Sequence, residues 1–182
     1  FILKTMERIT CLCATKVIPE GDGVKATLLR EHITRKPMEK IHNGNINGID
    51  LEHYDRTDQV MARAAEIRNG SKDFTFIFIG RMVRDKGINE LVAAFNRLNR
   101  QMAATRLLLV GKFEDDLDPV LPETKQMIEN NSKIKFVGYQ NDVRPYLAAA
   151  DVAVLPSYRE GFPNIVIQAG AMGLAQIVTD IN

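Results

Sequence analysis

Short apolar segments alternate with longer amphipathic stretches along the chain from about residue 74 onward. The short segments are rich in β-branched and aromatic residues, which is typical of strands, whereas the longer ones repeat apolar residues at helical spacing. This alternation predicts βαβ units and a parallel sheet. The expected strands span residues 74–79, 106–110, 135–137, 152–155 and 176–179, and their nearly continuous apolar character indicates that helices cover both faces.

Helices are expected between these strands. One has an apolar face formed by Ile88, Leu91, Val92, Phe95 and Leu98. The others are predicted over residues 122–129, over 143–149 with Asn141 or Asp142 as the N-cap, and from Pro163 or Asn164 to Met172, where Gly173 suits a left-handed C-terminal position. The fold class is therefore expected to be α/β, with a doubly wound, Rossmann-like parallel sheet in the usual strand order 3-2-1-4-5.

The first part of the chain follows a different pattern. Two helical stripes are formed by Ile2, Met6, Ile9 and Cys13 and by Val24, Leu28, Leu29 and Ile33, and residues 15–18 suggest a short strand. A charged stretch over 31–40 is typical of a connector. Residues 43–50 are rich in Asn and Gly, which permit the positive φ angles of tight turns. Asp58 is the expected N-cap of a helix that ends near Asn69.

Composition narrows the function classes. The chain has 182 residues and carries 24 Lys and Arg against 23 Asp and Glu, a net charge of +1. That balance gives no electrostatic support for nucleic-acid binding. No apolar run reaches the roughly 20 residues that a bilayer-spanning helix needs. The chain begins at Phe1 without a signal-peptide pattern, which leaves open that it is part of a longer product.

Cysteine and histidine offer no clear chemistry. Cys11 and Cys13 are too few for a disulfide framework and have no neighbouring ligands for zinc, so we expect buried free thiols. The acidic run Glu114, Asp115, Asp116 and Asp118 lacks metal-ligand spacing and is expected to be a solvated turn, and His32, His42 and His53 are expected to be structural.

The two most unusual segments follow the first and fourth expected strands. They are residues 80–87 and 156–164. In an open parallel sheet, ligands bind outside the carboxyl ends of the strands, where the strand order reverses. With the expected order, that crevice lies between the first and fourth strands. Both segments are therefore candidate binding loops.

The first loop is cationic. Arg81 and Lys86 lie between a strand and a helix N-terminus, and two cations, flexible glycines and a positive helix end favour a phosphate or diphosphate. The alternative is that both residues are solvated loop charges. The glycine spacing matches neither a Walker A motif nor a dinucleotide fingerprint, which removes support for P-loop hydrolysis and ordinary NAD binding.

The second loop offers acceptors and donors for a sugar phosphate. Glu160 can accept hydrogen bonds from hydroxyl groups, and the free N–H groups of a helix that starts at Pro163 or Asn164 suit anionic oxygen. Together they would recognise a polyhydroxylated ring attached to a phosphate. The alternative is an exposed carboxylate followed by a simple turn at Gly161.

A resemblance decides between these alternatives. The segment Glu160-Gly161-Phe162-Pro163-Asn164, with Gln168 after it, resembles the Glu-x7-Glu signature of retaining GT-B glycosyltransferases of family 4, the glycosyl transferases group 1. Further motifs of that family are matched in order at residues 80–81, 86–87, 109–111, 136–138, 150–152 and 178–180. Residues 43–50 resemble the loop that opens the donor-binding domain, and the match covers roughly residues 10–182.

The resemblance implies a role for each matched residue. Arg81 and Lys86 would hold the diphosphate of a nucleotide-sugar donor and stabilise the charge of the departing nucleoside diphosphate, and Glu160 would bind the donor sugar. The other donor-binding positions would be Gly80, then Val137, Gly138 and Tyr139 at the nucleobase, Gly161 and Phe162 beside the sugar, Pro163, Asn164 and Ile165 at the helix start near the phosphates, and Gln168 at the ribose. Gln168 departs from the family pattern, which has an acid there, and it loses charge-assisted acceptance from the ribose hydroxyls.

The resemblance also implies the domain organisation. Residues 1–38 would be the tail of an N-terminal acceptor domain plus a connector, and residues 39–182 the donor-binding domain, the C-terminal domain of a GT-B fold. In that fold a further strand and helices would follow, so the domain is expected to be incomplete at its C-terminal end, with a bare sheet edge at residues 176–179.

The predicted function is transfer of a sugar from a nucleotide-diphosphate sugar to a sugar or lipid-linked acceptor hydroxyl with retention, in bacterial surface polysaccharide synthesis. No cofactor, metal or nucleic acid is expected. The location would be cytoplasmic, with peripheral membrane contact through the missing N-terminal domain. Two alternatives stay open. One is a nucleotide-sugar-binding module without transfer activity of its own, and the other is a GT-B sugar-nucleotide epimerase.

Overall fold

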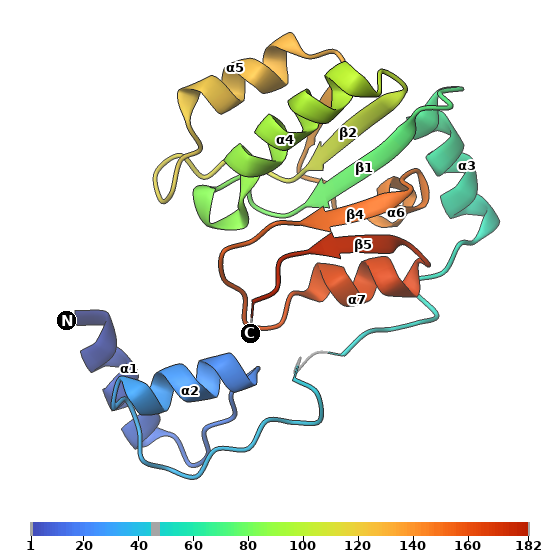
Figure 1. Cartoon of the computed structure of the whole chain (residues 1–182). Helices are drawn as coiled ribbons and strands as arrows, with labels where there is room; N and C mark the ends of the chain where they lie inside the picture. Colours follow the sequence, from blue (N-terminus) through green and yellow to red (C-terminus); the bar gives the residue numbers. More distant parts are fainter. Residues whose placement is uncertain (1, 45–47, 182) are drawn as a thin grey trace. The chain divides into compact units, whose positions relative to one another are not determined.

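The computed structural model describes residues 2–44 and 48–181 (Figure 1). Two compact units divide them. The first contains the described residues from 2 to 48 together with Glu160–Asn164, and the second contains Ile49–Arg159 and Ile165–Ile181. Each unit is described by itself below. Of the Asn- and Gly-rich loop expected over residues 43–50, positions 45–47 lie outside the described residues.

The second unit is built on a parallel sheet of five strands in the order β3-β2-β1-β4-β5, which confirms the expected order and fold class. The strands are β1 Phe74–Ile79, β2 Thr105–Val110, β3 Ile134–Gly138, β4 Val152–Leu155 and β5 Ala175–Val178. Each begins and ends within one residue of the expected strand, because a segment buried on both faces is apolar throughout. The order reverses between β1 and β4, the position at which the sequence predicts a ligand-binding crevice.

Helices cover both faces of this sheet (Figure 1). The elements are α3 Asp58–Arg68, the 3-10 turn η1 Arg84–Lys86, α4 Ile88–Gln101, α5 Pro122–Asn130, α6 Arg144–Ala148 and α7 Asn164–Ala171. Apolar residues of α4 and α5 pack on one face around Phe78 and Leu109, and those of α3, α6 and α7 pack on the other around Ile77 and Leu108. Neighbouring residues of one strand thus pack into opposite cores. Together with the reversal of strand order, the helices on both faces make this a doubly wound sheet.

The predicted apolar face of α4 is the clearest helix signal. Ile88, Leu91, Val92 and Phe95 are all buried, each at most 8% exposed. Burying side chains of this size contributes roughly 1.5–3 kcal/mol each relative to exposure. This face fixes α4, and with it the loop that precedes the helix, against the sheet.

The N-caps of two helices differ from the sequence predictions. The hydroxyl of Thr57, not the carboxylate of Asp58, caps α3 by accepting from the N–H of Val60, and Asp58 lies in the first helical turn. The N-cap of α6 is Val143 rather than Asn141 or Asp142, although the Asp142 carboxylate accepts from the N–H of Arg144 at 3.0 Å. Asp and Thr are both good caps, so only the backbone geometry decides between neighbours.

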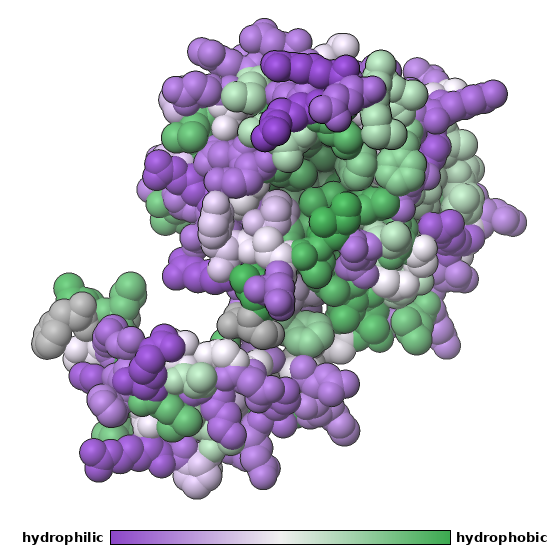
Figure 2. All heavy atoms as spheres, viewed as in Figure 1, coloured by the Kyte–Doolittle hydropathy of each residue, from purple (hydrophilic) through white to green (hydrophobic). Residues whose placement is uncertain are grey.

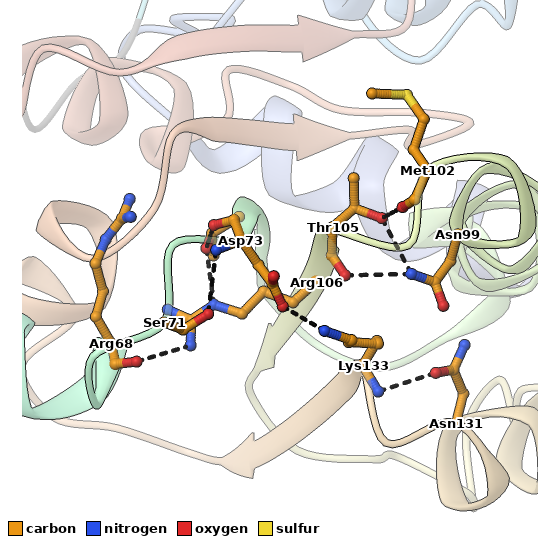
Figure 3. Close-up of polar contacts among 10 residues, drawn as sticks. Arg68, Ser71, Asp73, Asn99, Met102, Thr105, Arg106, Asn131 and Lys133 are labelled. Atoms are coloured by element: carbon orange, nitrogen blue, oxygen red, sulfur yellow. Dashed lines mark hydrogen bonds and ion pairs between the residues drawn. The ribbon is translucent and has the colours of Figure 1, made fainter.

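Polar contacts tie together the amino ends of β1, β2 and β3 (Figure 3). The Lys133 ammonium lies 2.6 Å from the Asp73 carboxylate. Arg106 donates through Nε to the Thr75 hydroxyl at 2.7 Å, and the Asn99 amide donates to the Thr105 hydroxyl at 3.1 Å. These contacts stabilise the amino ends of the strands. The candidate loops follow the opposite, carboxyl ends.

Strand β5 is the outermost strand on one side of the sheet, as expected from the sequence. Ile177 is 55% exposed and Val178 is 50% exposed. Figure 2 shows apolar side chains in the region where Figure 1 draws β5 and α7.

The first unit contains two helices among its described residues, α1 Ile2–Cys13 and α2 Asp22–Arg30. The short strand expected over residues 15–18 is only a single bridge between Val17 and Met38. The Lys36 ammonium donates to the carbonyl of Leu12 at 2.8 Å, which fixes the end of α1. Cys11 is buried as predicted, but Cys13 is exposed, because the two residues lie on different sides of the helix.

The outer face of α1 is apolar and exposed. Its large side chains are between 59% and 81% exposed: Ile2, Leu3, Met6, Ile9 and Leu12. No helix in the described part of the chain is both long and apolar enough to cross a membrane.

Candidate functional site

Two glycines bring the loops after β1 and β2 together. The Gly80 N–H donates to the Val110 carbonyl at 3.0 Å, and Gly111 has a φ of +145°. A Cβ added to Gly111 would lie 1.8 Å from the carbonyl oxygen of Gly80. The pairing continues beyond the strands, where the Met82 N–H donates to the Lys112 carbonyl at 2.8 Å. The backbones of the two loops are therefore fixed relative to each other.

A cavity of about 310 Å³ opens at the carboxyl ends of β1, β2 and β3. It is lined by Ile79, Gly80, Arg81, Val110, Gly111, Lys112, Glu114, Tyr139, Gln140 and Val143. Three of these, Gly80, Arg81 and Tyr139, are residues that the sequence singled out. Lys112, Glu114 and Gln140 were missed, although their positions directly after β2 and β3 are a usable signal in a parallel sheet.

Glu114 corrects the interpretation of the acidic run. Its carboxylate lies 2.9 Å from Nη1 of Arg81, and its side chain is 18% exposed, against 56% for Arg81. Two other members of the run also have partners, since Asp115 pairs with Lys125 at 2.8 Å and Asp118 accepts from the N–H of Asp85 at 2.8 Å. The run is therefore not a simple solvated turn. Among the described residues, no three His, Cys, Asp or Glu side chains are grouped to hold a metal ion.

Lys86 ends the 3-10 turn that leads into α4. Gly87 follows it with a φ of +69°, and a Cβ there would lie 2.1 Å from the carbonyl oxygen of Pro156. The N–H of Tyr158 donates to the carbonyl of Asp85 at 2.9 Å. The loop after β1 thus contacts the start of the loop after β4, as the neighbouring positions of these strands predict.

The residues of the Glu-x7-Glu resemblance are divided between the units. Glu160, Gly161, Phe162, Pro163 and Asn164 belong to the first unit, and Ile165 and Gln168 on α7 belong to the second. A Cβ on Gly161 would lie 2.8 Å from the Glu20 carboxylate, so this segment contacts a residue two positions before the start of α2. No motif or spacing in the sequence pointed to Glu20.

Gln168 hydrogen-bonds the Tyr54 side chain, a residue that the sequence did not single out. Burial, together with the nearby Asp142 charge, raises the pKa of the Tyr54 phenol. The Arg144 guanidinium holds Asp142 in place through Nε and Nη2, both at 2.9 Å, and donates to the His53 carbonyl at 2.8 Å. Gln168 therefore lies beside an ordered polar cluster.

At the end of β3, Tyr139 lines the cavity, whereas Val137 and Gly138 are not among its lining residues. Gly138 has a φ of +73°, Gln140 donates from Nε2 to the Val137 carbonyl at 3.0 Å, and Tyr139 is 68% exposed at the cavity. An exposed aromatic ring beside Arg81 and Lys112 suits a ligand that combines a flat ring with an anionic group.

Comparison with known proteins identifies the family of the chain. The family model of the glycosyl transferases group 1 matches residues 73–182. The capsular polysaccharide biosynthesis glycosyltransferase CapM of Staphylococcus aureus is 25% identical over the whole chain, which spans 47% of CapM. The putative teichuronic acid biosynthesis glycosyltransferase TuaC of Bacillus subtilis is 35% identical over 58% of the chain and 24% of TuaC.

Solved structures share the fold. Anabaena HepE in complex with UDP-glucose aligns with a TM-score of 0.79 and 19% identity, over 98% of this chain and 50% of HepE. The chain thus spans about half the length of CapM and of HepE. Since the family match covers more than half of the chain, the protein belongs to the glycosyl transferases group 1.

Proposed function

We propose that the chain is the donor-binding part of a retaining glycosyltransferase, which moves a sugar from a nucleotide-diphosphate sugar to an acceptor hydroxyl. The observation that carries the proposal is the cavity at the carboxyl ends of β1, β2 and β3, lined by Arg81 and Tyr139. Further support is that HepE, a protein of the same fold, has been solved with UDP and with UDP-glucose.

The chemistry needs a stabilised leaving group. When the bond between sugar and phosphate breaks, negative charge develops on the departing nucleoside diphosphate, and Arg81 and Lys86 would stabilise it. Glu160 would hold hydroxyls of the donor sugar, and Gln168 the ribose. A phosphate oxygen of the donor would take the proton of the acceptor hydroxyl, so the reaction requires neither a protein base in this chain nor a metal.

The acceptor side would lie in another domain. We propose that residues 1–38 are the tail of this acceptor domain and its connector, followed by the donor domain over residues 39–182. The exposed apolar face of α1 supports the proposal, because a helix with such a face is normally covered. The named roles of CapM and TuaC favour a sugar or lipid-linked acceptor in surface polysaccharide synthesis. A cytoplasmic location stays a prediction.

The direct test is nucleoside-diphosphate binding measured by calorimetry. The double substitution Arg81→Ala with Lys86→Ala is expected to abolish binding of UDP, GDP or ADP, whichever the unsubstituted chain binds most tightly. Arg97→Ala with Arg100→Ala is the matched control, because it removes the same charge from exposed positions on α4. Unchanged affinity in the Arg81→Ala, Lys86→Ala variant would contradict the assignment of these residues as diphosphate ligands.

A binding module without transfer activity is the second candidate, since the chain spans about half of CapM and HepE. A transfer assay separates the two. Activity only in a longer form that adds an acceptor domain supports the donor-half proposal, whereas activity in neither form supports a pure binder.

A further inference from the structure

Glu114 is a charged side chain in an unusual position. Its side chain is 18% exposed and lines the cavity with Arg81, which is 56% exposed. A carboxylate that is mostly shielded from water loses part of its hydration, and a hydrogen-bonded ionic partner replaces it. The Arg81 guanidinium, 2.9 Å away, provides that partner.

The backbone around the pair leaves little freedom. The contact of Gly111 with the Gly80 carbonyl and the 2.8 Å hydrogen bond from Met82 to Lys112 fix the loops from which Arg81 and Glu114 project. The position of the Glu114 carboxylate therefore restricts where the longer Arg81 side chain can place its guanidinium.

The contact leaves Arg81 able to bind a second anion. A guanidinium has five N–H donors, and Glu114 is contacted through Nη1. If Arg81 left Glu114 to reach a ligand, the partly shielded carboxylate would lose its partner, which costs free energy. An arrangement in which the guanidinium bridges Glu114 and the ligand avoids that cost and reduces the rotamer entropy lost on binding.

We infer that Glu114 is a positioning residue, which holds Arg81 at the mouth of the cavity for the diphosphate of the donor. This inference rests on the proposed function, because it takes Arg81 as a diphosphate ligand. The opposite arrangement, in which Glu114 competes with the diphosphate for Arg81, predicts the opposite sign for removal of the carboxylate.

A double-mutant cycle on Glu114 and Arg81 tests the inference. UDP affinity of the chain is measured by calorimetry for Glu114→Ala, Arg81→Ala and the double variant, with GDP and ADP as further probes. In the chain that retains Arg81, Glu114→Ala is expected to weaken UDP binding about tenfold, a typical coupling for contacting groups. In the Arg81→Ala background, the same change is expected to cause no loss.

Two further variants guard against a general loss of structure. Glu114→Gln keeps the shape and one acceptor oxygen, so its affinity is expected to lie between that of the unsubstituted chain and that of Glu114→Ala. Asp115→Ala is the matched control, because Asp115 belongs to the same run but pairs with Lys125 and does not line the cavity. It is expected to leave UDP affinity unchanged.

The outcomes separate this inference from the proposed function. If Arg81→Ala weakens UDP binding but Glu114→Ala has the same effect in both backgrounds, or raises affinity, the positioning role is wrong and the proposed function stands. If Arg81→Ala changes nothing, or the unsubstituted chain binds none of the three nucleotides, both fail.

Discussion

The backbone of Gly111 packs against the carbonyl of Gly80, so that a Cβ at Gly111 would lie 1.8 Å from the Gly80 oxygen. Gly111 also has a φ of +145°, a backbone angle that residues with a side chain rarely adopt. Gly111→Ala must move one loop, and we expect it to lower the free energy of unfolding by about 2–4 kcal/mol and to weaken UDP binding. Chemical denaturation and calorimetry measure the two effects.

Gly70→Ala is the control for this substitution. Gly70 has a φ of +72° but open space where a Cβ would lie. Its change tests backbone strain alone and is expected to cost about 1 kcal/mol with UDP affinity unchanged. Equal losses in the two variants would mean that the contact with Gly80 is unimportant.

The sheet could be predicted from the sequence because each strand is marked by the residue types of its own short segment. Residues 74–79 and 152–155 are apolar throughout, and such strands need cover on both faces, which leaves few topologies. The strand order placed the candidate crevice between β1 and β4, whereas the cavity lies at the ends of β1, β2 and β3, so it includes Arg81 but neither Lys86 nor Glu160. In these strands, the apolar residues that the sequence shows lie in apolar surroundings in the structure.

The missed residues depend on contacts between distant segments. Glu114 is one of several acids in a loop, and its contact with Arg81 depends on how closely the loops after β1 and β2 approach each other. Tyr54 contacts Gln168 from a segment with no periodic pattern. Neither environment can be deduced from neighbours in the chain, which is why the acidic run was expected to be solvated.

Asp151 links helix α3 to the start of β1. Its carboxylate accepts from Nη2 of Arg68 and from the N–H of Thr75, both at 2.7 Å, and Thr75 is fully buried. Asp151→Ala leaves a buried N–H without this acceptor, so we expect the free energy of unfolding to fall by about 2–3 kcal/mol in urea denaturation. Asp151→Asn keeps an acceptor for Thr75 and is expected to lose less.

The contribution of Asp142 to stability depends on pH. The hydrogen bond from the Arg144 side chain lowers the pKa of the Asp142 carboxyl below its ordinary value of 3.8. A carboxyl with a lowered folded-state pKa stabilises the fold above its ordinary pKa, and this stabilisation is lost as the pH falls through the folded-state pKa.

We therefore expect the unsubstituted chain to lose more stability between pH 5 and pH 2, roughly the range in which such a carboxyl titrates, than Asp142→Asn does. Thermal unfolding across that range measures the difference. Arg144→Gln, which removes the cause of the shift, is expected to flatten the curve in the same way. Parallel curves for all three proteins would contradict the role of this ion pair.

Gln168 offers a test of ribose recognition. Its amide lies against Tyr54, and a carboxylate at this position would accept more strongly from ribose hydroxyls. We expect Gln168→Glu to leave UDP affinity unchanged or to raise it, by up to about fivefold if the gain is ~1 kcal/mol. The gain should disappear with 2′,3′-dideoxy-UDP, which lacks the hydroxyls, and Gln126→Glu on the exposed face of α5 should show none. A large loss of UDP binding in Gln168→Glu would mean that other residues hold the ribose.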